Sequence, residues 1–178
     1  MKITDNIIAE CKKGDRAAWQ RLYELCSDDM YRLSLRYSNS HEEAKDILHD
    51  GFIKIFSKIG DYRGEGSFEG WMRRIFVTLA LDNLRKNKNM DFDAEKQLEK
   101  SDSGDYLSIL ESISEGELIS IMANLPTGYQ TVLKLYCVEG YSHSEIGKML
   151  RISTETSRSQ LMRAKNRLKQ LLADENIL

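Results

Sequence analysis

Residues 141–172 read YSHSEIGKML, RIS and TETSRSQLMRAKNRLKQLL in succession, two amphipathic segments joined by three residues. Apolar residues recur every three or four positions in both segments, which indicates helices with one buried face. A short helix, a tight turn and a longer basic helix are typical of a helix-turn-helix motif, whose second helix enters the major groove of DNA. The expected interior of this motif consists of Ile146, Met149, Leu150, Ile152, Leu161, Ala164 and Leu168.

The start of the basic helix is where such motifs reach base edges. The residues at that position are Arg158, Ser159, Gln160, Met162 and Arg163. A basic amphipathic helix can also serve only to pack a domain, but the spacing of the turn favours the DNA-binding interpretation.

The net charge of −2 hides two segments of opposite sign. Residues 151–170 carry six basic side chains and one acidic side chain, a net charge of +5. Residues 91–117 carry nine acidic and two basic side chains, a net charge of −7. A slightly acidic chain can therefore still contain the basic helix of a nucleic-acid-binding protein.

The acidic stretch divides the chain. Its apolar periodicity is weak and it contains SDSGD at residues 101–105, so we expect a linker, with a short helix around residues 106–113 as an option. The fold class predicted is all-α: two small helical domains, residues 1–90 and 116–178, joined by an acidic linker at 91–115. Three helix starts carry a serine followed three residues later by a glutamate that can cap it: Ser40 with Glu43, Ser114 with Glu117, and Ser142 with Glu145.

The helix that begins near His41 has apolar residues on two sides. Its core stripe is expected to contain Ala44, Ile47, Leu48, Gly51, Phe52, Ile55 and Ile59. The opposite face carries Asp46, Asp50 and Ser57, with Ile53 among them. An isoleucine ringed by carboxylates indicates a docking surface, but a single exposed isoleucine is also common, so both explanations stay open.

Residues 62–85 combine three glycines, aromatic rings and arginines. Ser67 is a plausible cap for a helix on which Trp71, Arg74, Thr78, Asp82 and Arg85 share one strip. Rings and cations beside a pliable loop suit single-stranded nucleic acid, because bases stack on rings while cations follow phosphates. For this stretch alone, a core tryptophan beside a solvated charged face is the more common explanation.

Composition excludes several classes of protein. Charged residues make up 30% of the chain, which has one proline and 8% aromatic residues, as expected for a soluble helical protein. No apolar run approaches a membrane span and no cleavable signal opens the chain, so we expect a cytoplasmic protein. Cys11, Cys26 and Cys137 lack metal-ligand spacing and are expected to be reduced, partly buried thiols. We expect no metal, no cofactor and no enzymatic activity.

Together these segments resemble the sigma-seventy family of bacterial transcription initiation factors, in its extracytoplasmic-function group, which keeps only the second and fourth sigma regions. The resemblance runs from DRAAWQRLYELC at residue 15 onward and lapses in the acidic linker. It rests on EEAKDILHDGFIKIF, GSFEGWMRRIFVTLALDNLRK, LPTGYQTVLKLYCVEGYSHSEIGKML and SRSQLMRAKNRL, which occur in the family's order and spacing. The loop and helix at 62–85 look especially like versions found in Bacteroidetes.

The resemblance implies three binding sites. The loop and helix at 62–85 would grip the minus-ten promoter element while it melts, with an everted non-template base in the loop. The residues implied for this site are Tyr62, Arg63, Phe68, Trp71, Arg74, Thr78 and Arg85. Asp46, Asp50 and Ile53 match the face that docks on the clamp helices of the polymerase β′ subunit. Binding at the minus-thirty-five element is implied for Thr156, Arg158, Ser159, Gln160, Met162, Arg163 and Arg167.

The partners implied are core RNA polymerase, through its β′ clamp helices and its β subunit, and promoter DNA. An anti-sigma factor, which can be membrane-bound, is a further implied partner, and no small-molecule substrate is implied. Linkers at this position in the family thread toward the RNA exit path, where a polyanion could mimic nucleic acid.

Four positions depart from the family's pattern. Thr78 stands where asparagine is frequent and Val77 where arginine often lies, so base preference at minus ten does not carry over. Arg151 and Glu155 replace glycines at the turn and near the start of the recognition helix. A left-handed conformation at Arg151 would cost on the order of 1 kcal/mol.

Two other classes of function remain as alternatives. The chain could be an ordinary helix-turn-helix regulator whose N-terminal helices dimerise or sense a ligand, and such a regulator would bind duplex operator DNA without polymerase. It could also be a helical enzyme that uses His41, His49 and nearby carboxylates, which stoichiometric metal in the purified protein would support.

Overall fold

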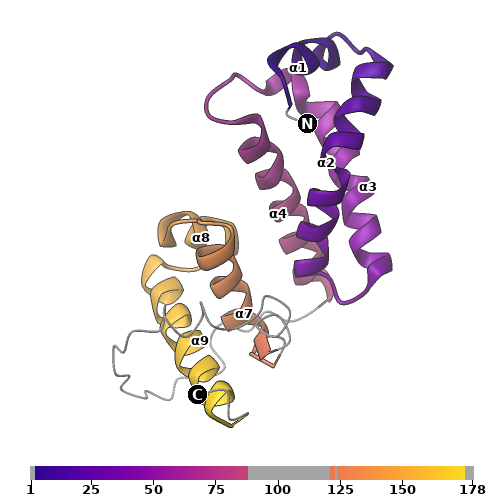
Figure 1. Ribbon diagram of the computed structural model, residues 1–178. Coiled ribbons are helices and arrows are strands. Elements are labelled where there is room, and N and C mark those ends of the chain that lie inside the picture. Colours follow the sequence, from indigo (N-terminus) through magenta and orange to yellow (C-terminus); the bar gives the residue numbers. More distant parts are fainter. Residues whose placement is uncertain (1–2, 88–120, 123, 175–178) are drawn as a thin grey trace. The chain divides into compact units, whose positions relative to one another are not determined.

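The computed structural model describes residues 3–87, 121–122 and 124–174, and the regular elements among them are all helices (Figure 1). The chain divides into two compact units, Met1–Asn89 and Met90–Leu178. The predicted all-α fold is confirmed. The expected linker at 91–115, its short helix and the cap at Ser114 lie outside the described residues.

The first unit contains α1 (Asp5–Lys12), α2 (Arg16–Tyr37), α3 (His41–Lys58), the short 3-10 helix η1 (Ile59–Asp61) and α4 (Phe68–Asn87). Helices α2, α3 and α4 pack against one another, and α1 lies against α2 and η1 at one end (Figure 1). The core stripe expected on α3 is buried apart from Leu48, which is half-buried. The buried residues of α2 and α4 include Leu22, Leu33, Met72, Phe76, Ala80 and Leu81.

Side-chain caps start several of these helices. Ser40 Oγ accepts a hydrogen bond from Glu43 N at 3.1 Å, as the sequence predicts. The carboxylate of Glu43, however, accepts bonds from Asn39 N at 2.7 Å and from Asn83 Nδ2 of α4 at 2.6 Å. Glu43 therefore ties the start of α3 to the preceding residue and to a neighbouring helix.

Gly51 allows α3 and α4 to approach each other closely. A Cβ atom at this position would lie 2.2 Å from Cε1 of Phe76, a distance that real contacts do not show. The neighbouring Phe52 ring meets Phe76 edge-on, with centroids 5.6 Å apart. This glycine is required because a side chain would push the aromatic rings of the core aside.

The second unit contains α7 (Thr127–Leu133), the π-helical turn η2 (Lys134–Val138), α8 (His143–Leu150) and α9 (Thr154–Asp174). Both α7 and α8 pack against α9. The interior expected for the helix-turn-helix is confirmed: Ile146, Leu150, Leu161, Ala164 and Leu168 are buried, and Met149 and Ile152 are half-buried. The predicted capping box is complete, since Ser142 Oγ accepts from Glu145 N and the Glu145 carboxylate accepts from Ser142 N.

The turn between α8 and α9 is strained at one residue. Arg151 is left-handed, with φ 59° and ψ 42°, as the sequence led us to suspect. The turn closes with a hydrogen bond from Ile152 N to Gly147 O at 3.0 Å. A Cβ at Gly147 would lie 2.9 Å from Ile152 O, so the two segments touch through backbone. Glu155 lies in the first turn of α9, where the helix dipole favours a carboxylate.

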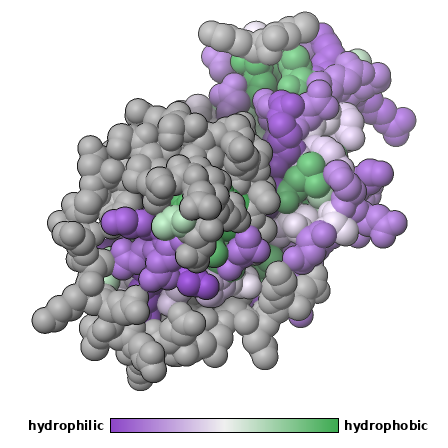
Figure 2. Space-filling model, turned by 60° about the horizontal axis from the view of Figure 1, so that its bottom comes forward, coloured by the Kyte–Doolittle hydropathy of each residue, from purple (hydrophilic) through white to green (hydrophobic). Residues whose placement is uncertain are grey.

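On the face seen in Figure 2, hydrophilic residues cover most of the described surface and hydrophobic residues show only in small patches. The described helices include none long and apolar enough to cross a membrane.

Candidate nucleic-acid and protein interfaces

The first candidate interface is an aromatic cluster, Tyr62, Phe68 and Trp71, where the loop at 62–67 meets α4. The ring centroids are 5.1 Å apart for Tyr62–Phe68, 5.6 Å for Tyr62–Trp71 and 5.4 Å for Phe68–Trp71. Phe68 is buried and supports the other two rings, whereas Tyr62 and Trp71 are half-buried. Tyr62 and Trp71 therefore keep part of their surface accessible.

The loop beside this cluster is shaped by glycines. Gly64 and Gly66 have φ of 80° and 87°, which side chains rarely tolerate. The Tyr62 hydroxyl donates a hydrogen bond to Gly66 O at 2.7 Å and so holds the two ends of the loop together. Ser67 Oγ accepts from Gly70 N at 3.0 Å, which confirms it as the cap of α4. Arg63, which follows Tyr62 in this loop, is exposed.

The strip predicted along α4 is partly exposed, because Trp71, Asp82 and Arg85 are half-buried. Arg74 and Thr78 are exposed, and Thr78 Oγ1 donates to Arg74 O at 2.7 Å. Arg85 is half-buried and its Nη1 lies 2.7 Å from Asp82 Oδ1. Trp71 itself is half-buried, so it is neither fully in the core nor fully exposed.

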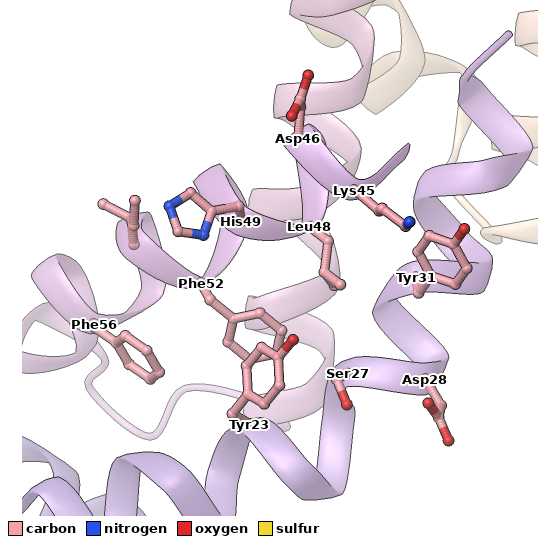
Figure 3. Close-up of a pocket in the computed structure, with 11 residues that line it drawn as sticks. Tyr23, Ser27, Asp28, Tyr31, Lys45, Asp46, Leu48, His49, Phe52 and Phe56 are labelled. Carbon is pink, nitrogen blue, oxygen red and sulfur yellow. The ribbon is translucent and has the colours of Figure 1, made fainter. Parts of the chain in front are cut away.

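The second candidate interface is an open groove of about 700 Å³ between α2 and α3 (Figure 3). Its floor is aromatic: the Tyr23 and Phe52 rings lie 4.6 Å apart, and Phe52 and Phe56 lie 5.8 Å apart. Ile53 borders the groove with 54% of its surface exposed, and Asp46 lies on the same rim. The rim also carries Lys45, His49 and Asp28.

A smaller cavity of about 300 Å³ lies between α3 and α4. Asp46 and Asp50 line it together with Glu42 and Glu43. Asp46 borders both cavities, so the residues expected to dock on polymerase are exposed on one side of α3. This face combines an exposed apolar side chain with carboxylates.

The third candidate interface is the exposed face of α9. Arg158, Met162 and Arg167 are exposed, while Thr156, Ser159 and Arg163 are half-buried. Thr156 N donates to Ser153 Oγ at 2.9 Å, and Ser159 Oγ donates to Thr156 O at 3.0 Å. Gln160 differs from the rest, because it is only 2% exposed and belongs to the interior of the unit.

His143 was not singled out by the sequence, yet it joins three elements of the second unit. Its ring stacks on Tyr136 of η2 with centroids 4.6 Å apart, and its Nδ1 lies 2.9 Å from Ser157 Oγ of α9. Burial, and then the nearby cations Arg158 and Lys165, lower the pKa of His143. No local signal could have found this contact, because Ser157 lies 14 residues further along the chain.

The three cysteines are free thiols. Cys11 and Cys26 are buried and Cys137 is exposed. Burial, reinforced by Glu69 and Asp29, raises the pKa of Cys26 to about 11. This thiol is protonated at neutral pH and packs as an apolar side chain.

Comparison with known proteins gives a consistent assignment. The family model described as Sigma-70 region 2 matches residues 22–90, and the one described as Sigma-70, region 4 matches residues 115–168. The chain is 30% identical over 167 residues to the ECF RNA polymerase sigma factor SigE of Mycolicibacterium smegmatis, a match that covers 90% of this chain and 65% of that protein. It is 26% identical to the ECF RNA polymerase sigma factor SigW of Bacillus subtilis, over 94% of this chain and 95% of that protein.

A solved structure has a similar fold. The sigma factor RpoE of Bartonella quintana, determined with the anti-sigma factor NepR, matches with a TM-score of 0.57 and 18% identity. The match covers 86% of this chain and 96% of that protein.

Proposed function

The chain belongs to the extracytoplasmic-function group of the sigma-70 family and directs RNA polymerase to promoters for transcription initiation, and we propose that it does so through the three interfaces described above. It is not an enzyme: a sigma factor supplies promoter specificity to the polymerase. The lineage suggested by the loop and helix at 62–85 stays a prediction.

The aromatic cluster is proposed to bind the melted minus-ten element. The observation that supports this most strongly is the half-buried Tyr62 and Trp71 rings beside a loop with two left-handed glycines. An unpaired base can stack on such rings, and Arg63 and Arg74 can follow the phosphates. Phe68 acts from beneath by holding the two rings in place.

The exposed face of α9 is proposed to bind the duplex minus-thirty-five element. Arg158 and Met162 lie one turn apart on this face, so a cation and an apolar side chain reach the same groove. Arg163 and Arg167 extend the cationic surface toward phosphates. Gln160 acts indirectly, as a buried residue that fixes the rotation of α9.

The exposed side of α3 is proposed to dock on the clamp helices of core polymerase. Ile53 supplies the apolar centre, and Asp46 and Asp50 supply charge around it. The aromatic groove next to Ile53 gives the partner a concave surface to fill.

An anti-sigma factor is proposed as a regulatory partner, because RpoE, which has a similar fold, was determined with one. The cytoplasm is proposed as the compartment, since the protein acts where RNA polymerase and promoter DNA are.

A DNA titration with and without core polymerase, at matched near-physiological salt, tests this function. We expect weak, salt-sensitive duplex binding by the free chain, and protection of both promoter elements by its complex with polymerase. Tight, sequence-specific binding by the chain alone would instead favour a stand-alone helix-turn-helix regulator.

A further inference from the structure

The loop at 62–67 is held by a residue far from it in the chain. Lys12, the last residue of α1, donates a hydrogen bond from its Nζ to the backbone oxygen of Tyr62 at 2.6 Å. The same ammonium group lies 5.5 Å from the centroid of the Tyr62 ring. Both contacts fall on the residue at which the loop begins.

Tyr62 is thereby fixed from two directions. Its backbone oxygen is held by α1, and its hydroxyl holds Gly66 at the other end of the loop. Its ring is one member of the aromatic cluster, in contact with Phe68 and Trp71. Any displacement of the Tyr62 backbone would therefore change the loop and the cluster together.

Helix α1 is itself firmly attached. Trp19 of α2 donates a hydrogen bond from Nε1 to Cys11 O at 2.9 Å, next to Lys12 in the chain. The Trp19 ring stacks on Phe56 of α3, with centroids 5.2 Å apart and planes 13° apart. Cys11 is buried against this framework. The end of α1 is thus a fixed point from which Lys12 reaches the loop.

We propose that Lys12 is a positioning residue for the binding of unpaired promoter DNA, and that it acts by holding the backbone of Tyr62. The proposal rests on the proposed role of the aromatic cluster. Lys12 lies outside residues 22–90, the part that matches the family's region 2. Alignment of the matched part alone would therefore miss it.

Lys12→Met tests the proposal, because methionine has a similar length but neither charge nor donor. Binding is measured between the complex with core polymerase and a fluorescent single-stranded oligonucleotide that carries the non-template minus-ten sequence of a promoter the complex opens. We expect binding to weaken about three- to tenfold, the range for a charged hydrogen bond that solvent partly screens. Lys12→Arg should restore most of the affinity, because arginine also presents a cationic donor.

Two further variants separate positioning from direct contact with DNA. Lys13→Met removes the neighbouring exposed charge and should leave binding unchanged. Tyr62→Phe frees the far end of the loop, so Lys12→Met should have a smaller effect in that background than alone. A lysine that touched a phosphate would instead give additive effects and lower the salt slope by about 0.7.

The outcomes distinguish this proposal from the function on which it rests. Equal binding by Lys12→Met and the unaltered protein, equal losses in Lys12→Met and Lys13→Met, or additive effects with a reduced salt slope would each overturn it. Trp71→Ala is measured in parallel. If Trp71→Ala weakens binding and Lys12→Met does not, only the role of Lys12 fails; if neither does, the proposed role of the aromatic cluster fails as well.

Discussion

Helices α4 and α9 both carry arginines that are exposed or half-buried, but the two helices differ in what lies beside those arginines. At the start of α4, the half-buried Tyr62 and Trp71 adjoin a loop with two left-handed glycines. On α9 the exposed face carries Arg158 and Met162. Beside them, Ser159 Oγ donates to Thr156 O and Thr156 Oγ1 lies 3.0 Å from Ser153 Oγ.

This difference matches the two forms of DNA that the interfaces are proposed to bind. An unpaired base exposes its flat face, which rings can stack on, whereas a paired base exposes only its edge in a groove. Cations serve both forms because both carry phosphates. The neighbours of the arginines, rather than their number, therefore separate the two interfaces.

The largest expected effect tests whether the two units are independent in stability. Gly51→Ala places a methyl group against Phe76, so we expect the first unit to lose about 1–3 kcal/mol or more, the range for overpacked cores. The second unit should keep its stability. Thermal unfolding followed by near-ultraviolet circular dichroism measures this, with Gly60→Ala as the control because that position faces open space. A parallel loss in both units would contradict their independence.

Trp71→Ala addresses the α4 side of the comparison. Loss of one stacking platform should weaken opening of the minus-ten element by about 1–3 kcal/mol per base, while minus-thirty-five binding is retained. Permanganate footprinting of the bubble and protection of the upstream element measure the two sites separately. If protection at both sites falls equally and the melting temperature drops, Trp71 has a structural role instead.

Ile53→Asp tests the docking face of α3, on which both DNA interfaces are proposed to depend. An unpaired charge in a docked surface should weaken binding to core polymerase by about 1–2 kcal/mol, yet leave folding intact because Ile53 lies off the core stripe. Competition for core polymerase measures the affinity. Ala17→Asp, at an exposed position near the start of α2 that lines neither cavity, adds the same charge and serves as the control. Unchanged affinity in Ile53→Asp would remove this face from the proposal.

Arg151→Gly concerns the turn that sets α9 in place. Glycine adopts the left-handed conformation without strain, so we expect the second unit to gain about 0.5–1 kcal/mol. Urea unfolding of the second unit gives the change. A loss of stability would mean that the arginine side chain contributes more than its backbone strain costs.

The smallest expected effect is a change in how the stability of the second unit depends on pH, through His143. The pKa of His143 is lowered from 6.5, so the unfolded chain binds its proton more readily than the folded chain does. The free energy of unfolding of the second unit is therefore highest above pH 6.5, where His143 is neutral in both states. It decreases as the pH falls from 6.5 toward the lower pKa of the folded state. His143→Gln should flatten this part of the pH profile of the second unit. An identical profile in the variant would contradict the assignment.

Periodic features were predictable from the sequence, and contacts between distant residues were not. The interior stripes of α3 and of the helix-turn-helix follow from apolar spacing, because burial of one helix face needs only local order. The exposure of Ile53 followed from the same pattern. The left-handed turn at Arg151 could be suspected because glycine is usual there.

The missed long-range contacts share a physical cause. The carboxylate of Glu43 was expected to close its own capping box, but it also bonds Asn83, 40 residues away. Lys12 and Tyr62 meet across 50 residues, and His143 and Ser157 meet through the turn. Such contacts depend on packing between helices, which no local spacing encodes. Gln160 is a different case: it is buried, and its spacing from Leu161 and Ala164 of the interior stripe already indicates this.

The tight turn before α9 has a use in engineering. Because Gly147 and Ile152 touch through backbone, and because Ser157, Gln160 and Leu161 are buried, both the direction and the rotation of α9 are set by residues that face inward. Arg158, Met162 and Arg167 take no part in that framework. Libraries that vary only those three side chains could therefore produce factors with new upstream preferences, suited to orthogonal gene circuits, while the scaffold stays unchanged.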